Sequence, residues 1–220
     1  MSEIKVIITG DGSHSLLNVA LDETYHSRHG AVQESRHVFI EQGLQYRINQ
    51  HPLKSISVLE VGFGTGLNAL LSAQEAIKRN VPMAYASLEP FPIPSSLWMT
   101  FNYPDPANLL TSLHLAEWQR WVEIHKNFKL LKLKSSLLDV ELEIKDFDLI
   151  YFDAFAPNKQ PELWDFLILE KVVSSIKSGG VFVTYCAKGQ LKRDLKALGL
   201  IVESLPGPPG KREMVRALKP

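Results

Sequence analysis

The chain has 220 residues, of which 45% are hydrophobic, and its formal net charge at pH 7 is zero. This length and hydrophobic content predict a single domain with a full core and argue against two independent domains. The neutral charge excludes a protein whose whole surface binds nucleic acid. Cys186 is the only cysteine, which excludes an intrachain disulfide, and the sequence contains neither a secretory leader nor an apolar run of about eighteen residues. We therefore expect a cytoplasmic protein with no membrane partner.

Residues 1–50 precede the main pattern of the chain. A hydrophobic run covers residues 4–8, a turn follows at residues 10–12, and polar and helical segments continue to residue 42. Strands and helices alternate only from residue 57 onward. We therefore expect residues 1–50 to form an N-terminal extension packed on a main domain of residues 51–220.

A glycine-rich loop joins the strand predicted at residues 57–61 to the helix predicted at residues 67–79. Glycines at every second position let the backbone turn sharply and approach a ligand. A dinucleotide-binding loop reads G-x-G-x-x-G, but Leu67 occupies its third glycine position, which argues against NAD. Glu60 ends the strand, where a buried carboxylate needs donors such as a ligand amine. The pattern predicts an S-adenosylmethionine site with the cofactor-binding residues Glu60, Gly62, Phe63, Gly64 and Gly66.

A second acid follows the next predicted strand, residues 83–88. Glu89 comes after Gly66 by roughly the twenty residues that place an acid on a ribose, and we expect it to bind the cofactor. The alternative is that Glu60 only caps loop amides and that Glu89 is an exposed strand terminus. The two acids together with the glycine loop favour the cofactor site.

Five prolines and three tryptophans lie between residues 89 and 128, and we expect this stretch to decorate one end of the sheet. Trp118 and Trp121 have the i, i+3 spacing of a helix. This spacing favours core packing over a platform for stacking bases.

Asp153 ends the strand predicted at residues 147–153, and a loop of small and aromatic residues follows it. Open α/β sheets bind ligands at the carboxyl ends of their strands, so a substrate amine would meet Asp153 there. The alternative is that Asp153 caps its own loop or the helix predicted at residues 161–176, which ends at residues 177–180. Its place beside the cofactor end of the sheet favours the site.

The C-terminal part of the chain is locally basic, with eight basic residues against three acids from residue 188 onward. Lys192, Arg193 and Lys196 are explained equally by contacts with RNA phosphates and by a solvated helix face. The strands predicted at residues 201–204 and 214–218 are joined by a Pro-Gly segment too short for a helix. They should therefore pair antiparallel.

The fold class follows from the alternation of these elements. Further strands are predicted at residues 128–132 and 181–186, and a further helix at residues 188–197. Such alternation predicts a parallel sheet with helices on both faces. We expect a Rossmann-like α/β fold of the class I S-adenosylmethionine-dependent methyltransferase type, mostly parallel, with an antiparallel last strand and an N-terminal extension.

The run DAFAPNKQPELW at residues 153–164 resembles the D-[GA]-F-[AS]-P-x-K-x-P-x-x-W motif of the MnmC-type tRNA wobble-uridine methyltransferases, including stand-alone MnmD-type members. Residues 60–67 are similar to the family's G-F-G-T-G-L loop. Residues 30–39 resemble its G-x-x-x-E-[ST]-[RK]-x-V-F segment, and residues 210–214 resemble its K-R-E-M strand. The resemblance covers nearly the whole chain. It implies methyl transfer from S-adenosylmethionine to the aminomethyl nitrogen of 5-aminomethyl-(2-thio)uridine in tRNA.

The resemblance also bears on individual residues. The family places a Gly-Asp pair near the adenine, where this chain has Ser136, with Asp139 as a second candidate. Fused members carry a flavin-dependent oxidase domain, but this chain ends after the last strand, so we expect neither FAD nor a metal. Lys211 and Arg212 would meet RNA phosphates, unless they only solubilise the hairpin. Asp153 is the expected catalytic residue, and the expected substrate-binding residues are Glu34 (by resemblance alone), Phe155, Pro157, Tyr185, Lys211 and Arg212.

Methyl transfer is an in-line displacement by a neutral amine. Alignment contributes about 7–11 kcal/mol to such reactions, whereas a positioned base contributes about 10²- to 10⁴-fold. With an ordinary carboxyl pKa near 4, Asp153 should orient the amine rather than accept its proton. The alternatives are a small-amine methyltransferase or aminopropyltransferase, and a non-catalytic module that binds S-adenosylmethionine or RNA.

Overall fold

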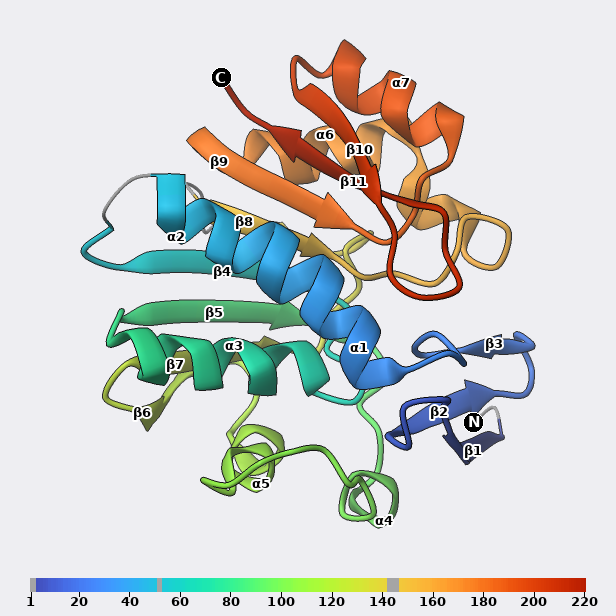
Figure 1. Ribbon diagram of the computed structural model, residues 1–220, viewed down its shortest axis with the longest axis vertical. Helices are drawn as coiled ribbons and strands as arrows, with labels where there is room; N and C mark the ends of the chain where they lie inside the picture. The colour runs from blue at the N-terminus through green and yellow to red at the C-terminus, as the bar shows by residue number, and fades with distance from the viewer. Residues whose placement is uncertain (1–2, 51–52, 142–146) are drawn as a thin grey trace.

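The computed structural model describes residues 3–50, 53–141 and 147–220. In these ranges a mixed eight-stranded sheet forms the centre of the molecule, in the order β10-β11-β9-β8-β4-β5-β7-β6 (Figure 1). Its strands are β4 (Ile56–Val61), β5 (Met83–Leu88), β6 (Trp121–His125), β7 (Phe128–Leu133), β8 (Phe147–Phe152), β9 (Ile176–Thr184), β10 (Ile201–Pro206) and β11 (Glu213–Leu218).

The strand directions confirm the predicted fold class. Strands β4, β5, β7, β8 and β9 run parallel, and β11 lies antiparallel between β9 and β10. The Pro-Gly segment therefore makes the predicted antiparallel hairpin. The carboxyl ends of the parallel strands meet at one edge, which is where ligands bind in open sheets of this kind.

The edge strand β6 is a feature that the helical spacing of the tryptophans did not predict. Trp121 begins this strand and is 42% exposed, while Trp118 forms an isolated bridge with Lys132. The period-two alternation of residues 121–125 pairs them antiparallel with β7, so a tight hairpin overrides the helical pattern. The core packing predicted for Trp118 and Trp121 is therefore wrong: Trp121 is exposed and Trp118 is only partly buried.

Helices cover both faces of the sheet (Figure 1). On one face lie α1 (Ala31–Ser35), the π-helix η1 (Arg36–Gln45), α2 (Tyr46–Gln50), α3 (Leu67–Arg79) and α5 (Leu109–Leu115). On the other face lie α6 (Phe166–Ser174) and α7 (Gly189–Ala197). No helix within the described ranges is long and apolar enough to cross a membrane.

The helix predicted at residues 161–176 is divided in the structure. A 3₁₀ turn, η2 (Pro161–Trp164), is followed by Asp165 in an extended conformation, and α6 begins only at Phe166. Residues 176–180 start β9 instead of ending a helix, because Ile176 pairs with Phe147. The register of β8 and β9 then shifts, and Gly179 takes a φ of 73° at this irregularity.

The N-terminal residues form a separate small sheet of β1 (Ile4–Ile8), β2 (His14–Asn18) and β3 (Glu23–Thr24). It lies beside the carboxyl ends of the parallel strands (Figure 1). Asp11 Oδ2 accepts a hydrogen bond from the backbone N–H of Gln33, which ties this segment to the first turn of α1. The boundary predicted at residue 50 stays a prediction, since residues 51 and 52 lie outside the described ranges.

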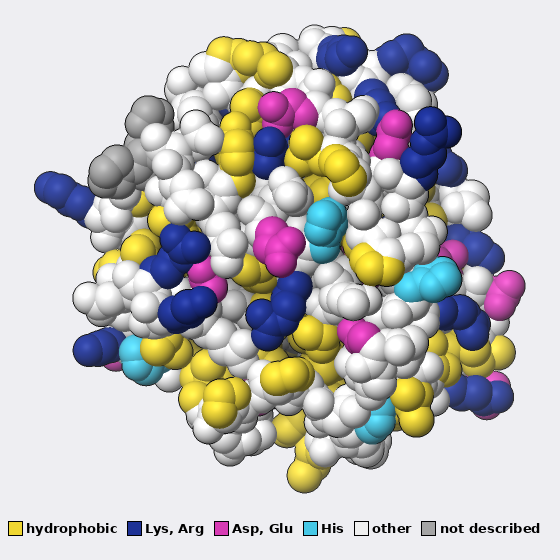
Figure 2. Space-filling model, in the orientation of Figure 1, with side chains coloured by type: hydrophobic (Ala, Val, Ile, Leu, Met, Phe, Trp, Pro, Cys, Tyr) yellow, Lys and Arg dark blue, Asp and Glu magenta, His cyan; other side chains and the backbone are white. Residues whose placement is uncertain are grey.

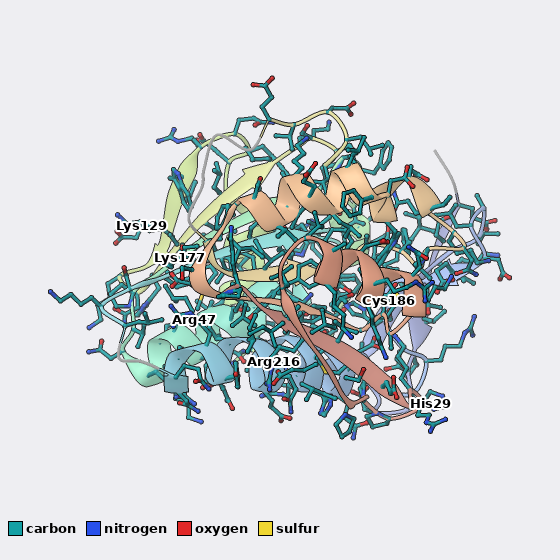
Figure 3. All side chains as sticks on the ribbon, turned by 90° about the horizontal axis from the view of Figure 1, so that it is seen from above. His29, Arg47, Lys129, Lys177, Cys186 and Arg216 are labelled. Carbon is teal, nitrogen blue, oxygen red and sulfur yellow. The ribbon has the colours of Figure 1, made fainter. Side chains whose placement is uncertain are left out.

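An ion cluster fastens the opposite end of the sheet. Asp148, at 1% exposure, contacts Arg47 Nη2 at 2.9 Å and Lys177 Nζ at 2.8 Å, and it accepts a hydrogen bond from the backbone N–H of Ser57. Arg47 and Lys177 lie together toward one end of the molecule, whereas Cys186 lies toward the other (Figure 3). The cluster joins α2, β4, β8 and β9 far from the carboxyl ends of the strands.

Candidate active site

A cavity of about 1060 Å³ opens at the carboxyl ends of β4, β5 and β8. The glycine loop (residues 62–66), the segment after β5, the segment after β8 and the N-terminal sheet all contribute to its lining. Parallel strands bring these loops to one edge even though they are far apart in sequence. This volume is at the upper end of the range for small-molecule pockets, so it has room for a cofactor and a second reacting group.

The glycine loop turns through backbone conformations that side chains rarely adopt. Gly62 has a φ of 94° and Gly64 a φ of 49°, and both line the cavity. A Cβ at Gly62 would lie 2.9 Å from the backbone oxygen of Asp153. Gly66, with a φ of 75°, begins α3 and packs against Phe63 and His114 rather than lining the cavity. Its role is to shape the loop.

Glu89 is held in the cavity wall by backbone amides. Its Oε2 accepts from the N–H of Gly64 at 2.9 Å, and its Oε1 accepts from the N–H of Phe91 at 2.8 Å. The side chain is buried, which raises its pKa. The alternative of an exposed strand terminus is therefore wrong. Each carboxylate oxygen keeps lone pairs for further donors such as ribose hydroxyls.

Glu60 differs from its expected placement. It is fully buried, it does not line the cavity, and its Oε2 accepts from Ser87 Oγ at 2.6 Å. Burial, with a contribution from the nearby charge of Asp153, raises the pKa of Glu60 to about 8. The period of two along β4 explains the difference, because Glu60 faces α3 together with Val58. Glu60 thus neither caps the loop amides nor reaches into the cavity.

Asp153 lines the cavity directly beside the glycine loop. Its Oδ2 accepts from Asn68 Nδ2 at 2.8 Å, and its backbone N–H donates to the oxygen of Val61. Burial, assisted by the charge of Glu34, raises the pKa of Asp153 to about 7, although Asn68 and Lys211 oppose the shift. The expectation of an ordinary carboxyl pKa is wrong. The group can exchange a proton near neutral pH.

Glu34, Lys211 and Tyr185 meet at the cavity wall. Lys211 Nζ lies 2.6 Å from Glu34 Oε1 and 3.8 Å from the centre of the Tyr185 ring. The Tyr185 hydroxyl donates to the backbone oxygen of Ala154 at 2.8 Å. All three residues line the cavity. Lys211 therefore pairs with an acid inside the site. The expectation that Lys211 contacts an RNA phosphate is wrong.

The remaining predicted residues divide between the cavity and its surroundings. Phe63, Phe155 and Ser136 line the cavity, whereas Asp139 is exposed and does not. The Phe155 ring packs edge-on against Tyr25, with their centres 5.2 Å apart. Pro157 and Arg212 lie outside, along an adjoining groove of about 510 Å³ that shares Tyr185 and Lys211 with the cavity.

Asn68 and His26 are two of the lining residues that the sequence analysis did not predict. Asn68 follows the glycine loop in the first turn of α3, and a polar residue among buried neighbours was the available signal. His26 lies in the N-terminal segment, which has no periodic pattern, so no signal singled it out. Its Nδ1 lies 3.0 Å from Ser15 Oγ, and burial lowers its pKa to about 4. His26 is therefore a neutral part of the wall.

The residues of the cavity fit S-adenosylmethionine. The cofactor has a positively charged sulfur, and the carboxyl groups of Glu34, Glu89 and Asp153 all line the space. Gly62 and Gly64 leave room for close approach, and apolar residues such as Leu88 and Leu137 offer a surface for the adenine. In the described ranges no group of His, Cys, Asp and Glu side chains is arranged to hold a metal ion.

Comparisons with known proteins point to one family. The MnmC protein of Methylobacillus flagellatus, named as a tRNA 5-methylaminomethyl-2-thiouridine biosynthesis bifunctional protein, is 28% identical over 88% of this chain and 32% of its own length. The protein of the same name from Actinobacillus pleuropneumoniae serotype 5b is 29% identical over 90% of this chain and 33% of its own length. This chain thus spans about a third of the curated relatives that it matches.

Solved structures agree with these relatives. The crystal structure of MNMC2 from Aquifex aeolicus matches with a TM-score of 0.82 at 25% identity, covering 100% of this chain and 72% of that chain. DesVI of Streptomyces venezuelae shares the fold, with a TM-score of 0.50 at 14% identity over 86% of this chain and 92% of its own. The resemblance to MnmC-type proteins is confirmed. Residues 105–220 match a family model, and the chain belongs to that family of S-adenosyl-L-methionine-dependent methyltransferases.

Proposed function

We propose that this chain transfers a methyl group from S-adenosylmethionine to the aminomethyl nitrogen of 5-aminomethyl-(2-thio)uridine at the wobble position of tRNA. The relatives named for 5-methylaminomethyl-2-thiouridine biosynthesis support this substrate, and the match covers about a third of each of them. The observation that carries the proposal is Asp153, a carboxyl group with a raised pKa beside the glycine loop of a methyltransferase.

The cofactor is assigned to the glycine-loop side of the cavity. Gly62 and Gly64 let the backbone approach it, and Phe63 lines the same wall. Glu89 accepts from the ribose hydroxyls, and Ser136 faces the adenine. When bound, S-adenosylmethionine supplies a methyl group on a positively charged sulfur. Glu60 is buried against Ser87 and does not line this side of the cavity, so we do not assign it to the cofactor.

Asp153 performs two tasks in the proposed mechanism. As a carboxylate it orients the substrate amine, whose lone pair must point at the methyl group. As the N–C bond forms, the sulfur–methyl bond breaks and leaves a neutral thioether, the nitrogen becomes positive, and the carboxylate stabilises this charge. With a pKa of about 7, Asp153 also accepts the proton that the methylated nitrogen releases. The transfer is redox-neutral, so the proposal needs no FAD.

The walls of the cavity protect the amine. Phe155 and Tyr185 exclude water, and the Glu34–Lys211 pair closes the side next to Tyr185. Residues 1–50 act as the N-terminal extension of a methyltransferase domain of residues 51–220, because the N-terminal sheet and Glu34 complete the site. We place the reaction in the cytoplasm, with tRNA as the partner.

Outside the cavity, the adjoining groove is assigned to RNA. Arg212 and Lys188 line it and are exposed. Figure 2 shows lysine and arginine side chains gathered over the part of this face where Figure 1 places α7. Pro157, Ala156 and Ala187 give the same groove an apolar floor. Cations above an apolar floor suit a nucleotide, which combines a phosphate with a flat base.

Nucleoside mass spectrometry tests the proposed function. Transfer RNA from cells blocked at the aminomethyluridine stage is incubated with this protein and S-adenosylmethionine. Conversion to methylaminomethyluridine is the expected result, and Asp153→Asn is the matched control. Methylation of a free amine without any change in tRNA would instead support a small-amine methyltransferase. Cofactor binding without transfer to either acceptor would support a non-catalytic module.

A further inference from the structure

A buried polar row runs beneath α3 and ends at the site. Glu60 on β4 accepts from Ser87 on β5, and Asn68 on α3 donates to Asp153 after β8. Glu60 and Ser87 are fully buried, and Asn68 is 3% exposed. Glu60 does not line the cavity, but its carboxyl group faces the Asn68 side chain and is close enough to Asp153 to feel its charge.

Two acceptors in this row lack a donor. Among the described residues no hydrogen-bond partner reaches Glu60 Oε1 or Asn68 Oδ1, and both atoms are buried. One of the two hydrogens on the Asn68 amide nitrogen is donated to Asp153, and the Tyr85 hydroxyl, which faces Glu60, also has no partner within the described ranges. Leaving a buried acceptor unpaired costs about 1–3 kcal/mol, so an arrangement that gives both atoms a partner is strongly favoured.

We propose that Glu60 is a positioning residue that acts through Asn68. Its protonated carboxyl group donates to Asn68 Oδ1, and the Asn68 amide, fixed in this way, keeps its Nδ2 on Asp153 Oδ2. The inference rests on the proposed function, because it assigns Asp153 to the reaction. In this inference Glu60, the acid before the glycine loop, acts without contacting the cofactor.

The surroundings of Glu60 favour the protonated form. Burial and the charge of Asp153 raise its pKa to about 8, so the group is mostly neutral at pH 7. The polar groups facing it are Ser87 and Tyr85 on β5, Tyr151 on β8, Asn68 on α3 and Asp153. None of these is a cation.

The nearest cation in the same row of the sheet is already engaged. Ser87 is paired in register with Glu60 on one side and with Lys132 on the other. The Lys132 ammonium donates to the backbone oxygen of His114 at 2.7 Å and lies 4.6 Å from the centre of the Trp118 ring. Tyr85 has one hydroxyl proton and cannot serve Glu60 and Asn68 together. The carboxyl proton supplies the missing donor.

The experiment compares Glu60→Gln with Glu60→Met. Glutamine keeps an N–H donor for Asn68 at every pH, whereas methionine has a similar size and no donor. We expect Glu60→Gln to retain kcat within about threefold, and Glu60→Met to lower kcat at least about fivefold, as losing one buried hydrogen bond implies. The Kd for S-adenosylmethionine should change by less than about threefold in both variants, since neither loses a cofactor contact.

The pH profile separates positioning from simple structural support. The wild-type kcat should fall above about pH 8 as Glu60 loses its proton, whereas that of Glu60→Gln should stay level. The same alkaline fall in Glu60→Gln, or full activity in Glu60→Met, would overturn the inference. So would a large loss of cofactor affinity in Glu60→Gln, because it would place the acid on the ligand.

Infrared spectroscopy tests Glu60 independently of the substrate. The difference spectrum of wild type against Glu60→Gln at pH 7 should contain the carbonyl band of a protonated carboxyl group. Absence of that band would overturn the inference even if the protein were inactive on tRNA. An inactive wild type that shows the band would contradict the proposed function and leave the Glu60–Asn68 contact standing.

Discussion

Lys211 Nζ lies 2.6 Å from Glu34 Oε1, although the two residues are 177 positions apart in the chain. The contact joins the start of α1 to the hairpin between β10 and β11 across the wall of the cavity. Glu34 Oε2 meanwhile accepts from the backbone N–H of Ser27 at 2.6 Å. The N-terminal segment and the C-terminal hairpin therefore close one site together.

Lys211→Met tests this closure. Glu34 is 5% exposed, and without Lys211 its carboxylate would lose its ion pair. We expect methylation to fall by about one order of magnitude, with the Kd for S-adenosylmethionine nearly unchanged, because the cofactor is assigned to the glycine-loop side and not to Lys211. Steady-state kinetics and calorimetry measure the two effects. Lys196→Met on the exposed side of α7 is the control, and equal losses in both variants would contradict the assignment.

Asp153→Asn should lower kcat by about 10²- to 10⁴-fold while leaving cofactor binding intact, as expected on losing a positioned acceptor. The wild-type kcat should also rise with pH through about 7, because Asp153 acts as a carboxylate and is protonated below its pKa. The variant should lack this rise. A variant that retained the wild-type rate would remove Asp153 from the mechanism.

The raised pKa of Glu60 predicts the pH dependence of stability. The pKa of Glu60 is about 8 in the folded chain, whereas its ordinary value, which applies to the unfolded chain, is 4.5. Between these two pH values the folded state therefore binds more protons than the unfolded state. The contribution of Glu60 to the free energy of unfolding should therefore be largest below about pH 5, and it should fall as the pH rises from about 5 to 8. Urea denaturation at pH 6 and pH 8 should show a smaller fall for Glu60→Gln than for the wild type. Equal falls would mean that Glu60 does not titrate in this range.

The ion cluster around Asp148, at the other end of the sheet, should affect the stability of the chain but not its function. Asp148→Asn leaves the 7%-exposed side chain of Arg47 with a weaker partner and should lower the free energy of unfolding by about 3–5 kcal/mol. Asp139→Asn, at an exposed position, should change it by less than about 0.5 kcal/mol. Chemical denaturation compares the two. The Kd for S-adenosylmethionine should be unaffected in both, since the cluster is remote from the cavity.

The sequence was sufficient where local chemistry decides the structure. The glycines at residues 62 and 64, the acid at residue 89 and Asp153 after β8 each follow from a strand end and a loop, and they line the cavity as predicted. Gly66 does not line it, because it caps α3 and packs against Phe63 and His114. Glu60 was misplaced because a strand turns alternate side chains to opposite faces, and only the position of α3 decides which face is covered. Lys211 was misplaced because its partner is 177 residues away. A contact between residues so far apart in the sequence leaves no signal in the local sequence pattern.

Arg212 provides the last prediction, which concerns RNA binding. It is exposed beside the groove that continues from Tyr185 and Lys211, and its neighbour Glu213 is already paired with Lys192 at 2.6 Å. A phosphate contact at Arg212 should release about one counterion, so Arg212→Ala should weaken binding of the anticodon stem-loop and reduce the salt dependence by about one unit of log–log slope. Fluorescence anisotropy over a range of salt concentrations measures both quantities, and Lys196→Ala serves as the control for general charge loss. An unchanged slope for Arg212→Ala, or an equal change for Lys196→Ala, would show that this groove does not hold the RNA backbone.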